Sequence, residues 1–238
     1  VIVLSVGKSG RTWLRVLLNK YLALHTGREF SLADLDDYDG SLPKILFDHE
    51  AWSHFCDNPW YKRLAGRNVI PDNLLRRKKI VLLYRDPRDV VVSLYFQKTR
   101  RSRQRVEMPL SDFIRDPHFG IDNIVWVMNL WRDRLRNHPA CHWMSYEAMQ
   151  MDIEAELAGL LAFIGLYPIL PERLLEAVVF AGFSNMKKME AEDRFGHPIL
   201  RARDPGDPDS FKVREGRVGG YLAHLGGERR AALHHPHV

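Results

Sequence analysis

The sequence has 238 residues, 45% of them hydrophobic, and its 35 Lys and Arg residues exceed its 30 Asp and Glu residues, giving a formal net charge of +5. This composition fits one globular domain with a continuous core and excludes a fibrous, low-complexity or mainly disordered chain. Two cysteines cannot form a disulfide framework, and they lack the paired spacing of a zinc site, which favours a reducing compartment. The longest uncharged stretch of note, residues 157–171, contains Gly and Pro and is shorter than the ~20 apolar residues of a membrane-spanning helix. We therefore expect a cytoplasmic protein, although the sequence starts at Val1 inside an apolar run, which leaves a preceding membrane anchor or signal open.

The first half of the chain alternates predicted strands with predicted helices. Residues 1–6 are an apolar, β-branched run that ends at Gly7, and residues 12–24 carry apolar side chains at helical spacing. Short strands are also predicted at residues 44–47 and 79–84, and the second has the unbroken apolar run of a strand covered on both faces. Asp86 and Pro87 then indicate the N-cap and first turn of a helix that continues through residues 90–98.

The second half continues this pattern, with a helix predicted over residues 121–136, a strand over 142–144, and helices over 147–164 and 172–180. The alternation predicts an α/β fold like that of the P-loop nucleotide hydrolases, in which a central, mainly parallel sheet is flanked by helices in a single domain spanning residues 1–238. Its ligand site should lie at the carboxyl ends of the strands. We interpret the proline-rich, charged segment 193–212 as a mobile loop and candidate lid, and residues 226–238 as a flexible tail.

Residues 7–12, with the sequence Gly-Lys-Ser-Gly-Arg-Thr, have the chemistry of an anion-binding loop between the first strand and the first helix. Glycines let backbone N–H groups close around an oxyanion, and the helix N-terminus adds a positive dipole. Lys8 and the hydroxyls of Ser9 and Thr12 supply further donors. A P-loop nucleotidase motif would need a glycine five positions before the Gly-Lys-Ser, where this chain has Ile2. A tight turn with a surface lysine is the plain structural alternative.

This loop resembles the 5′-phosphosulfate loop of the sulfotransferases, which use 3′-phosphoadenosine 5′-phosphosulfate (PAPS) as co-substrate. The family loop typically reads Pro-Lys-Ser-Gly-Thr-Thr-Trp-Leu, and here Gly7 replaces the proline and Arg11 the first threonine. The resemblance continues in the family's order through residues 84–95, 145–149 and 213–225. It implies transfer of a sulfuryl group from PAPS to a hydroxyl or amine acceptor. It also implies that the loop residues which bind the co-substrate are Lys8, Ser9, Gly10, Arg11, Thr12 and Trp13.

Arg85 and Ser93 are placed to hold a phosphate group. Arg85 leaves a buried strand at its carboxyl end, where a guanidinium can grip a phosphate with two parallel hydrogen bonds, and Ser93 lies two turns along the next helix. The alternative is an ordinary ion pair between Arg85 and Asp86 or Asp89. The resemblance implies that Arg85 and Ser93 bind the 3′-phosphate of the nucleotide.

Further nucleotide contacts follow from the resemblance alone. Arg214 and Gly216 match a family Arg-Lys-Gly motif that binds the 3′-phosphate, but here Glu215 replaces the lysine. A carboxylate repels a phosphate, so Glu215 either turns outward or this loop contributes less than usual. Trp13 and Tyr146 match residues that contact the adenine, and each could instead serve only in core packing.

Sulfuryl transfer needs a base for the acceptor and positive charge for the departing phosphate, which cationic side chains can supply without a metal. Lys8 is the candidate for the leaving-group side. His49 is the candidate base, because it follows the predicted strand 44–47 and its ordinary pKa of ~6.5 suits the task. Its segment resembles a family segment ending in Lys-Thr-His, with Asp48 in place of the threonine. His54 is the nearest rival, and a surface histidine beside an acid is the plain alternative.

The segment 98–105 contains five cations and no acid. Such a run is more often a solvated face than a site border, but if it faces the cleft it favours an anionic acceptor. We expect a small-molecule, saccharide or lipid acceptor, no nucleic-acid partner and no metal, and leave homodimerisation open. A P-loop kinase or nucleotidase is the main enzymatic rival, although Arg85 stands where its acidic Mg²⁺ ligand should follow the strand. Two non-catalytic functions also stay open: a module that binds nucleotide or nucleic acid through the basic segments 76–79 and 98–105, and a degenerate sulfotransferase without turnover.

Overall fold

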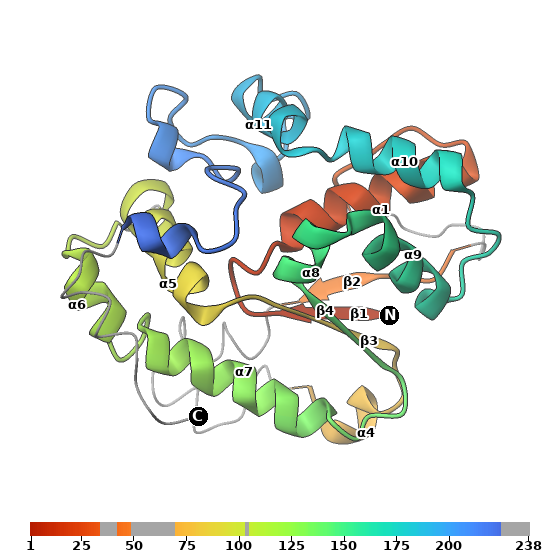
Figure 1. Ribbon diagram of the computed structural model, residues 1–238, viewed down its shortest axis with the longest axis horizontal. Coiled ribbons are helices and arrows are strands. Elements are labelled where there is room, and N and C mark those ends of the chain that lie inside the picture. The colour runs from red at the N-terminus through yellow and green to blue at the C-terminus, as the bar shows by residue number, and fades with distance from the viewer. Residues whose placement is uncertain (34–41, 49–69, 103–104, 225–238) are drawn as a thin grey trace.

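A computed structural model describes residues 1–33, 42–48, 70–102 and 105–224 of the chain (Figure 1). Its centre is a four-stranded sheet in the order β2-β1-β3-β4. The strands are β1 (Ile2–Ser5), β2 (Leu46–Asp48), β3 (Ile80–Tyr84) and β4 (Cys141–Ser145), and every neighbouring pair is parallel. The predicted α/β fold with a central parallel sheet is therefore confirmed.

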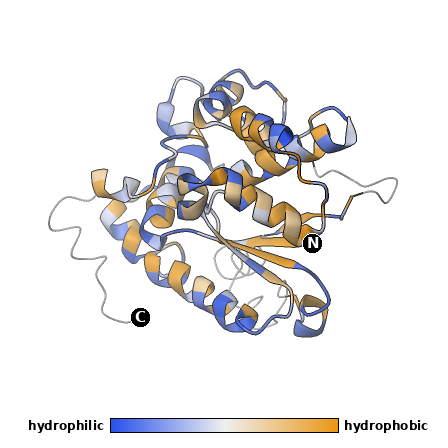
Figure 2. Cartoon of the chain, turned by 45° about the vertical axis from the view of Figure 1, so that its right-hand side comes forward, coloured by the Kyte–Doolittle hydropathy of each residue, from blue (hydrophilic) through white to orange (hydrophobic). Residues whose placement is uncertain are grey.

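Alternate residues of each strand point to opposite faces of the sheet, and each face packs against its own layer of helices. In β1, Val3 belongs to one core cluster and Leu4 to the other, and Val81 and Leu82 of β3 divide in the same way. Because both faces are covered, the central strands β1 and β3 are mainly apolar, and much of the sheet is orange in Figure 2.

The first layer consists of α1 (Arg11–Thr26), α8 (Tyr146–Met151), α9 (Ile153–Ile164), α10 (Pro171–Phe180) and α11 (Phe183–Ala191). The second consists of α4 (Asp72–Leu75), α5 (Pro87–Phe96), α6 (Leu110–Arg115) and α7 (Ile121–Leu135). A π-helix, η2 (Gln97–Arg101), extends α5, and the 3-10 helices are η3 (Pro198–Leu200), η4 (Pro208–Ser210) and η5 (Gly220–Ala223). Figure 1 shows α1 and α7 on opposite sides of the sheet. Among the described residues, no helix is both long and apolar enough to cross a membrane.

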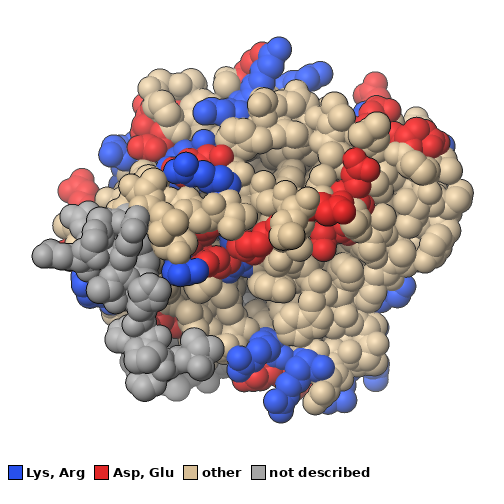
Figure 3. Space-filling view, viewed as in Figure 1, with Lys and Arg blue, Asp and Glu red and all other residues tan. Residues whose placement is uncertain are grey.

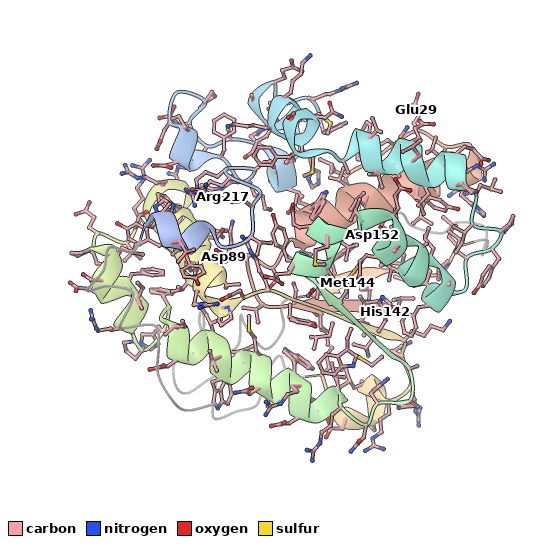
Figure 4. The ribbon with its side chains drawn as sticks, in the orientation of Figure 1. Glu29, Asp89, His142, Met144, Asp152 and Arg217 are labelled. Atoms are coloured by element: carbon pink, nitrogen blue, oxygen red, sulfur yellow. The ribbon has the colours of Figure 1, made fainter. Side chains whose placement is uncertain are left out.

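The helix predicted over residues 147–164 is two helices, because the chain leaves helical geometry at Asp152. This residue has φ −148° and ψ 84°, and its carboxylate accepts a 2.9 Å hydrogen bond from the backbone N–H of Ala155, which caps α9 (Figure 4). The short helix α6 and the helix α11 were not predicted. The pattern of apolar residues in both is too brief to separate from a loop.

The segment 193–212 contains η3 and η4 and is held by several hydrogen bonds. Arg101 donates to the carbonyl oxygens of Arg201, at 3.2 Å, and Ser210, at 3.1 Å. Leu200 and Ser210 are fully buried. The segment therefore has a defined path beside η2, and its mobility stays a prediction. The predicted tail, 226–238, lies outside the described residues.

Candidate functional site

A cavity of about 500 Å³ opens where β1, β3 and β4 end and their following helices begin. Its wall contains residues from the loop after β1, from α5 and α8, and from the C-terminal segment 212–221. This is the edge of a parallel sheet at which α/β proteins bind ligands. The sequence-predicted site residues that line it are Lys8, Gly10, Arg11, Thr12, Trp13, Arg85, Ser93, Tyr146, Arg214 and Gly216.

Of the predicted site residues that the structure describes, Ser9 does not line the cavity. Ser9 is completely buried beneath the loop, and its hydroxyl has no hydrogen-bond partner among the described residues. His49, the predicted base, lies outside the described residues, as does its rival His54. Asp48, which precedes His49, ends β2 opposite Leu4, so β2 ends at the same edge of the sheet as β1.

The loop that precedes α1 adopts the strained backbone expected of an anion cradle. Lys8 has φ +72° and Gly10 has φ +94°, both in the left-handed region that favours glycine. Gly10 caps α1 without a side chain, and the first turn of α1 carries no acidic residue. The helix dipole at this end of the cavity therefore favours an incoming anion, and the first turn adds no carboxylate to oppose it.

The amino group of Lys8 lies in a strongly cationic environment. Burial lowers its pKa well below its usual value, and the charges of Lys212, Arg101 and Arg85 lower that pKa further, while Glu190 opposes them. Such a group gains most from a bound anion, because an anion would offset both the lost hydration and the repulsion.

Arg85 both makes the predicted ion pair and lines the cavity. One of its terminal nitrogens lies 3.4 Å from a carboxylate oxygen of Asp89 and donates to the carbonyl oxygen of Arg217 at 3.0 Å. Its guanidinium lies 4.1 Å from the ring centroid of Tyr146, and its buried Nε has no hydrogen-bond partner within the described part of the chain. Figure 4 shows Asp89 on α5 next to Arg217 of the C-terminal segment. The guanidinium is thus held in place while its Nε donor is still unused.

Trp13 and Tyr146 serve as packing residues while they face the cavity. Their rings meet edge to face at 5.7 Å, and the indole N–H of Trp13 donates to the carbonyl oxygen of Ala181 at 3.0 Å. Burial raises the pKa of Tyr146, whose hydroxyl accepts a hydrogen bond from Gln150. Core packing and contact with a ligand are therefore compatible roles, because the two rings pack against each other and both residues also line the cavity.

Glu215 faces the cavity instead of turning outward, and a weaker contribution of its loop to phosphate binding stays a prediction. It lines the cavity and pairs with Arg214, with Nε of Arg217 at 3.1 Å and with Nε2 of His224 at 3.0 Å. Burial on its own would raise the pKa of Glu215, but the hydrogen bond to His224 and the charge of Arg214 hold it below its usual value. Part of the charge of Arg214 is therefore neutralised by a neighbouring carboxylate.

The basic segment 98–105 is not simply a solvated face. Lys98 lines the cavity, and the π-helix directs Arg101 inward to Glu190, whereas Arg100 is exposed and Arg103 lies outside the described residues. On the face drawn in Figure 3, Lys and Arg side chains lie in separate groups with Asp and Glu between them and form no continuous basic stripe. The predicted absence of a nucleic-acid partner stays a prediction.

Sequence reasoning missed Lys212, which lines the cavity, and Glu190 on α11, which holds the backbone of the segment that contains Lys212. Glu190 is almost fully buried and accepts hydrogen bonds from Arg101 at 2.8 Å and from the backbone N–H groups of Lys212, at 2.6 Å, and Val213, at 2.8 Å. Neither residue belongs to a recognisable motif. In the described ranges, no three His, Cys, Asp or Glu side chains gather as a metal site would require.

Comparison with known proteins extends the resemblance over nearly the whole chain. Residues 1–228 match the family described as the sulfotransferase domain. The chain is 26% identical over 209 residues to flavonol 4′-sulfotransferase of Flaveria chlorifolia, an alignment that covers 80% of this chain and 64% of that protein. It is 24% identical over 250 residues to the amine sulfotransferase of Oryctolagus cuniculus, covering 94% of this chain and 75% of that protein.

Two solved structures share the fold. A mouse sulfotransferase complexed with PAP superposes with a TM-score of 0.62 at 17% identity, over 98% of this chain and 81% of that one. Retinol dehydratase in complex with retinol and PAP gives a TM-score of 0.63 at 18% identity, over 97% and 77%. The chain spans less than two thirds of the length of flavonol 4′-sulfotransferase and of cytosolic sulfotransferase 14 of Arabidopsis thaliana. With the family matched over residues 1–228, this chain belongs to the sulfotransferase family.

Proposed function

We propose that this protein is a PAPS-dependent sulfotransferase that transfers a sulfuryl group to the hydroxyl or amine of a small-molecule acceptor. The observation that carries this proposal is the excess of hydrogen-bond donors and positive charge in the cavity. Lys8, Arg85 and Arg214 all line the same cavity, and the N-terminus of α1 lies at its wall. A nucleotide with a 5′-phosphosulfate and a 3′-phosphate supplies anionic oxygens for all of them.

The described residues fit such a nucleotide. Arg85 lines the cavity, and its unused Nε is a buried donor that an oxyanion would satisfy. The left-handed turn at Gly10 brings the loop backbone close to the ring of Tyr146, and Gly216 likewise lies against the ring of Phe183. Neither position has room for an added Cβ, so glycine lets the loop backbone pack directly against the aromatic rings beside the cavity.

The residues can divide the reaction as follows. His49 takes the proton of the acceptor hydroxyl while the acceptor oxygen forms its bond to sulfur. Lys8 donates a hydrogen bond to the oxygen that bridges sulfur and phosphorus, so that charge building up on this oxygen is neutralised as its bond to sulfur breaks. Arg85, Ser93 and Arg214 hold the 3′-phosphate and fix the position of the nucleotide. Because side chains supply the positive charge, we propose that the reaction is independent of metal.

Two relatives point to a small acceptor. Their names give a flavonol and an amine as the acceptors, and the structure of retinol dehydratase, which has a related fold, contains bound retinol. A kinase or nucleotidase is the weaker alternative, because Arg85 rather than an acid follows β3 and pairs there with Asp89.

Calorimetry with 3′,5′-adenosine bisphosphate (PAP) and 5′-AMP tests the nucleotide site. The wild-type protein should prefer PAP by about tenfold or more, since a guanidinium–phosphate pair is a charge-assisted contact. Arg85→Ala should lose this preference. Arg88→Ala is the matched control, because Arg88 follows three positions later but pairs with Asp86 at 2.6 Å and does not line the cavity.

A wild-type protein that binds PAP and 5′-AMP equally would contradict the proposed site. A second experiment measures turnover with PAPS as donor. Mass spectrometry detects the sulfated products of an acceptor panel that contains phenols, aliphatic alcohols and amines. Addition of EDTA should leave the rate unchanged, and a rate that falls with EDTA and returns with Mg²⁺ would contradict the proposed independence of metal.

A further inference from the structure

Lys212 belongs to none of the sequence motifs, yet its side chain lines the same cavity as Lys8. Its charge lowers the pKa of Lys8, second only to burial, so the two amino groups are electrostatic neighbours. The Nζ of Lys212 donates a 3.1 Å hydrogen bond to the carbonyl oxygen of Ile199. An ammonium has three donors, so this contact leaves capacity for a ligand.

The surroundings of Lys212 hold more positive than negative charge. Arg101, Arg11 and Arg15 all lower its pKa, and among the described residues Glu190 opposes them. Glu190 is already occupied, because Arg101 and the N–H of Lys212 bind one of its oxygens and the N–H of Val213 binds the other. One carboxylate therefore offsets only part of the positive charge of Arg101, Lys8 and Lys212. The excess charge fits a ligand group with at least two negative charges.

We propose that Lys212 is a second lysine for the 5′-phosphate end of the nucleotide, where it contacts the same anionic group as Lys8. This inference rests on the proposed function. In the free protein, burial followed by the charge of Arg101 lowers the pKa of Lys212 to about 7, so a substantial fraction of the molecules carries a neutral amine at neutral pH. An anion placed beside it favours the ammonium form, and binding is accompanied by uptake of a proton.

The direction of the pH effect follows from this linkage. Above pH 7 the free protein must take up a proton to bind, so affinity falls as pH rises, by up to about tenfold per unit for one fully linked proton. The charged and titratable groups around Lys212 are Lys8 and Arg11 from the phosphate loop and its helix, Arg15 of α1, Arg101 of η2 and Glu190 of α11. The pKa of Lys8 is also lowered, so Lys8 would take up a proton on binding as well. Variants are therefore needed to show which lysine takes up the proton.

Calorimetry of PAP and 5′-AMP binding between about pH 6 and pH 9, in buffers with different ionisation enthalpies, measures affinity and proton uptake together. Lys212→Met should weaken both ligands alike, by about tenfold or more at low pH, and should reduce proton uptake by about half a proton near pH 7. Lys212→Arg keeps the charge without titrating, so it should keep affinity at low pH and show a flatter pH profile. Lys188→Met is the control, since Lys188 is exposed on α11.

Three outcomes would overturn the inference. Proton uptake and affinity in Lys212→Met that equal those of the wild type would remove Lys212 from the site. A loss confined to PAP would place Lys212 at the 3′-phosphate instead. A wild-type protein that binds neither ligand would overturn the proposed function as well, whereas Arg85→Ala separates the two proposals, because it should weaken PAP binding only.

Discussion

The carboxylate of Glu190 accepts a 2.8 Å hydrogen bond from the guanidinium of Arg101, although 89 positions separate the two residues in the chain. The Glu190 side chain is completely buried, and the same carboxylate accepts two backbone N–H groups of the segment that leads into Arg214. One acidic group thus joins α11, the π-helix and the C-terminal segment at the cavity wall. The pairing aligns the elements that carry Lys212 and Arg214.

Glu190→Gln should destabilise the protein by about 3 kcal/mol, because it leaves the buried charge of Arg101 without a counter-ion. Urea unfolding measures the change, and Glu192→Gln is the matched control two residues later. Glu192 forms only an exposed pair with Lys188 at 3.9 Å, so its loss should cost less than about 0.5 kcal/mol. Equal stabilities of the two variants would show that the buried pair does not hold these segments together.

Gly10→Ala should weaken PAP binding by about tenfold in addition to a loss of stability. An added Cβ would lie 2.6 Å from the ring of Tyr146 and would require a left-handed φ of +94°. Gly27→Ala is the control for backbone strain alone, since Gly27 has φ +69° and an added Cβ there would meet nothing within 4 Å. We expect Gly27→Ala to lose about 1 kcal/mol of stability and to keep its affinity. If Gly10→Ala bound PAP as tightly as the wild type, the close contact between Gly10 and the ring of Tyr146 would not be needed for nucleotide binding.

Glu215→Gln should strengthen PAP binding by about tenfold and leave 5′-AMP binding unchanged. The carboxylate faces the cavity and occupies Arg214, so its removal frees a guanidinium and removes a repulsive charge near the proposed 3′-phosphate. Calorimetry with the two ligands on one variant provides the internal control. Weaker PAP binding in Glu215→Gln would instead mean that Glu215 is needed to orient Arg214.

The elements around the phosphate loop could be predicted because each carries a strong local signal. β3 is covered on both faces and therefore has an unbroken apolar sequence, and Asp86 with Pro87 marks the start of α5, where the Asp86 side chain accepts from the N–H of Arg88. The loop at residues 7–12 combines glycines, a lysine and hydroxyls between a strand and a helix. Such signals depend only on neighbouring residues.

The parts that sequence reasoning missed depend on contacts between distant segments. Nothing local distinguishes Glu190 from the exposed Glu192, because burial of one and not the other is set by the docking of Arg101. Lys212 is adjacent to a predicted motif but acquires its properties from cations on α1 and η2. The orientation of Glu215 toward the cavity follows from its pairing with His224, nine positions later.

Stability of the ligand-free protein should rise with pH between about pH 7 and pH 9, and Lys212 should supply part of this rise. Its pKa in the folded protein is about 7, below the ordinary lysine value of 10.5, so between these values the unfolded chain binds more protons than the folded one. Folding then releases a proton, and removing protons from solution favours the folded state. The expected gain from this one group is about 1 to 2 kcal/mol across the interval.

Urea unfolding of the wild type and of Lys212→Met at about pH 7 and pH 9 measures the contribution of Lys212. Lys212→Met should be the more stable of the two at pH 7, since it removes a buried amine surrounded by Arg11, Arg15 and Arg101, and its advantage should shrink at pH 9. Lys188→Met should follow the wild-type profile, because Lys188 is exposed to solvent. The stabilisation that PAP gives the wild type should have the opposite pH dependence and be larger at pH 7 than at pH 9. The reason is that the bound anion favours the ammonium form of Lys212. A wild-type and a Lys212→Met profile that run parallel at both pH values would show that Lys212 stays fully protonated in the folded protein.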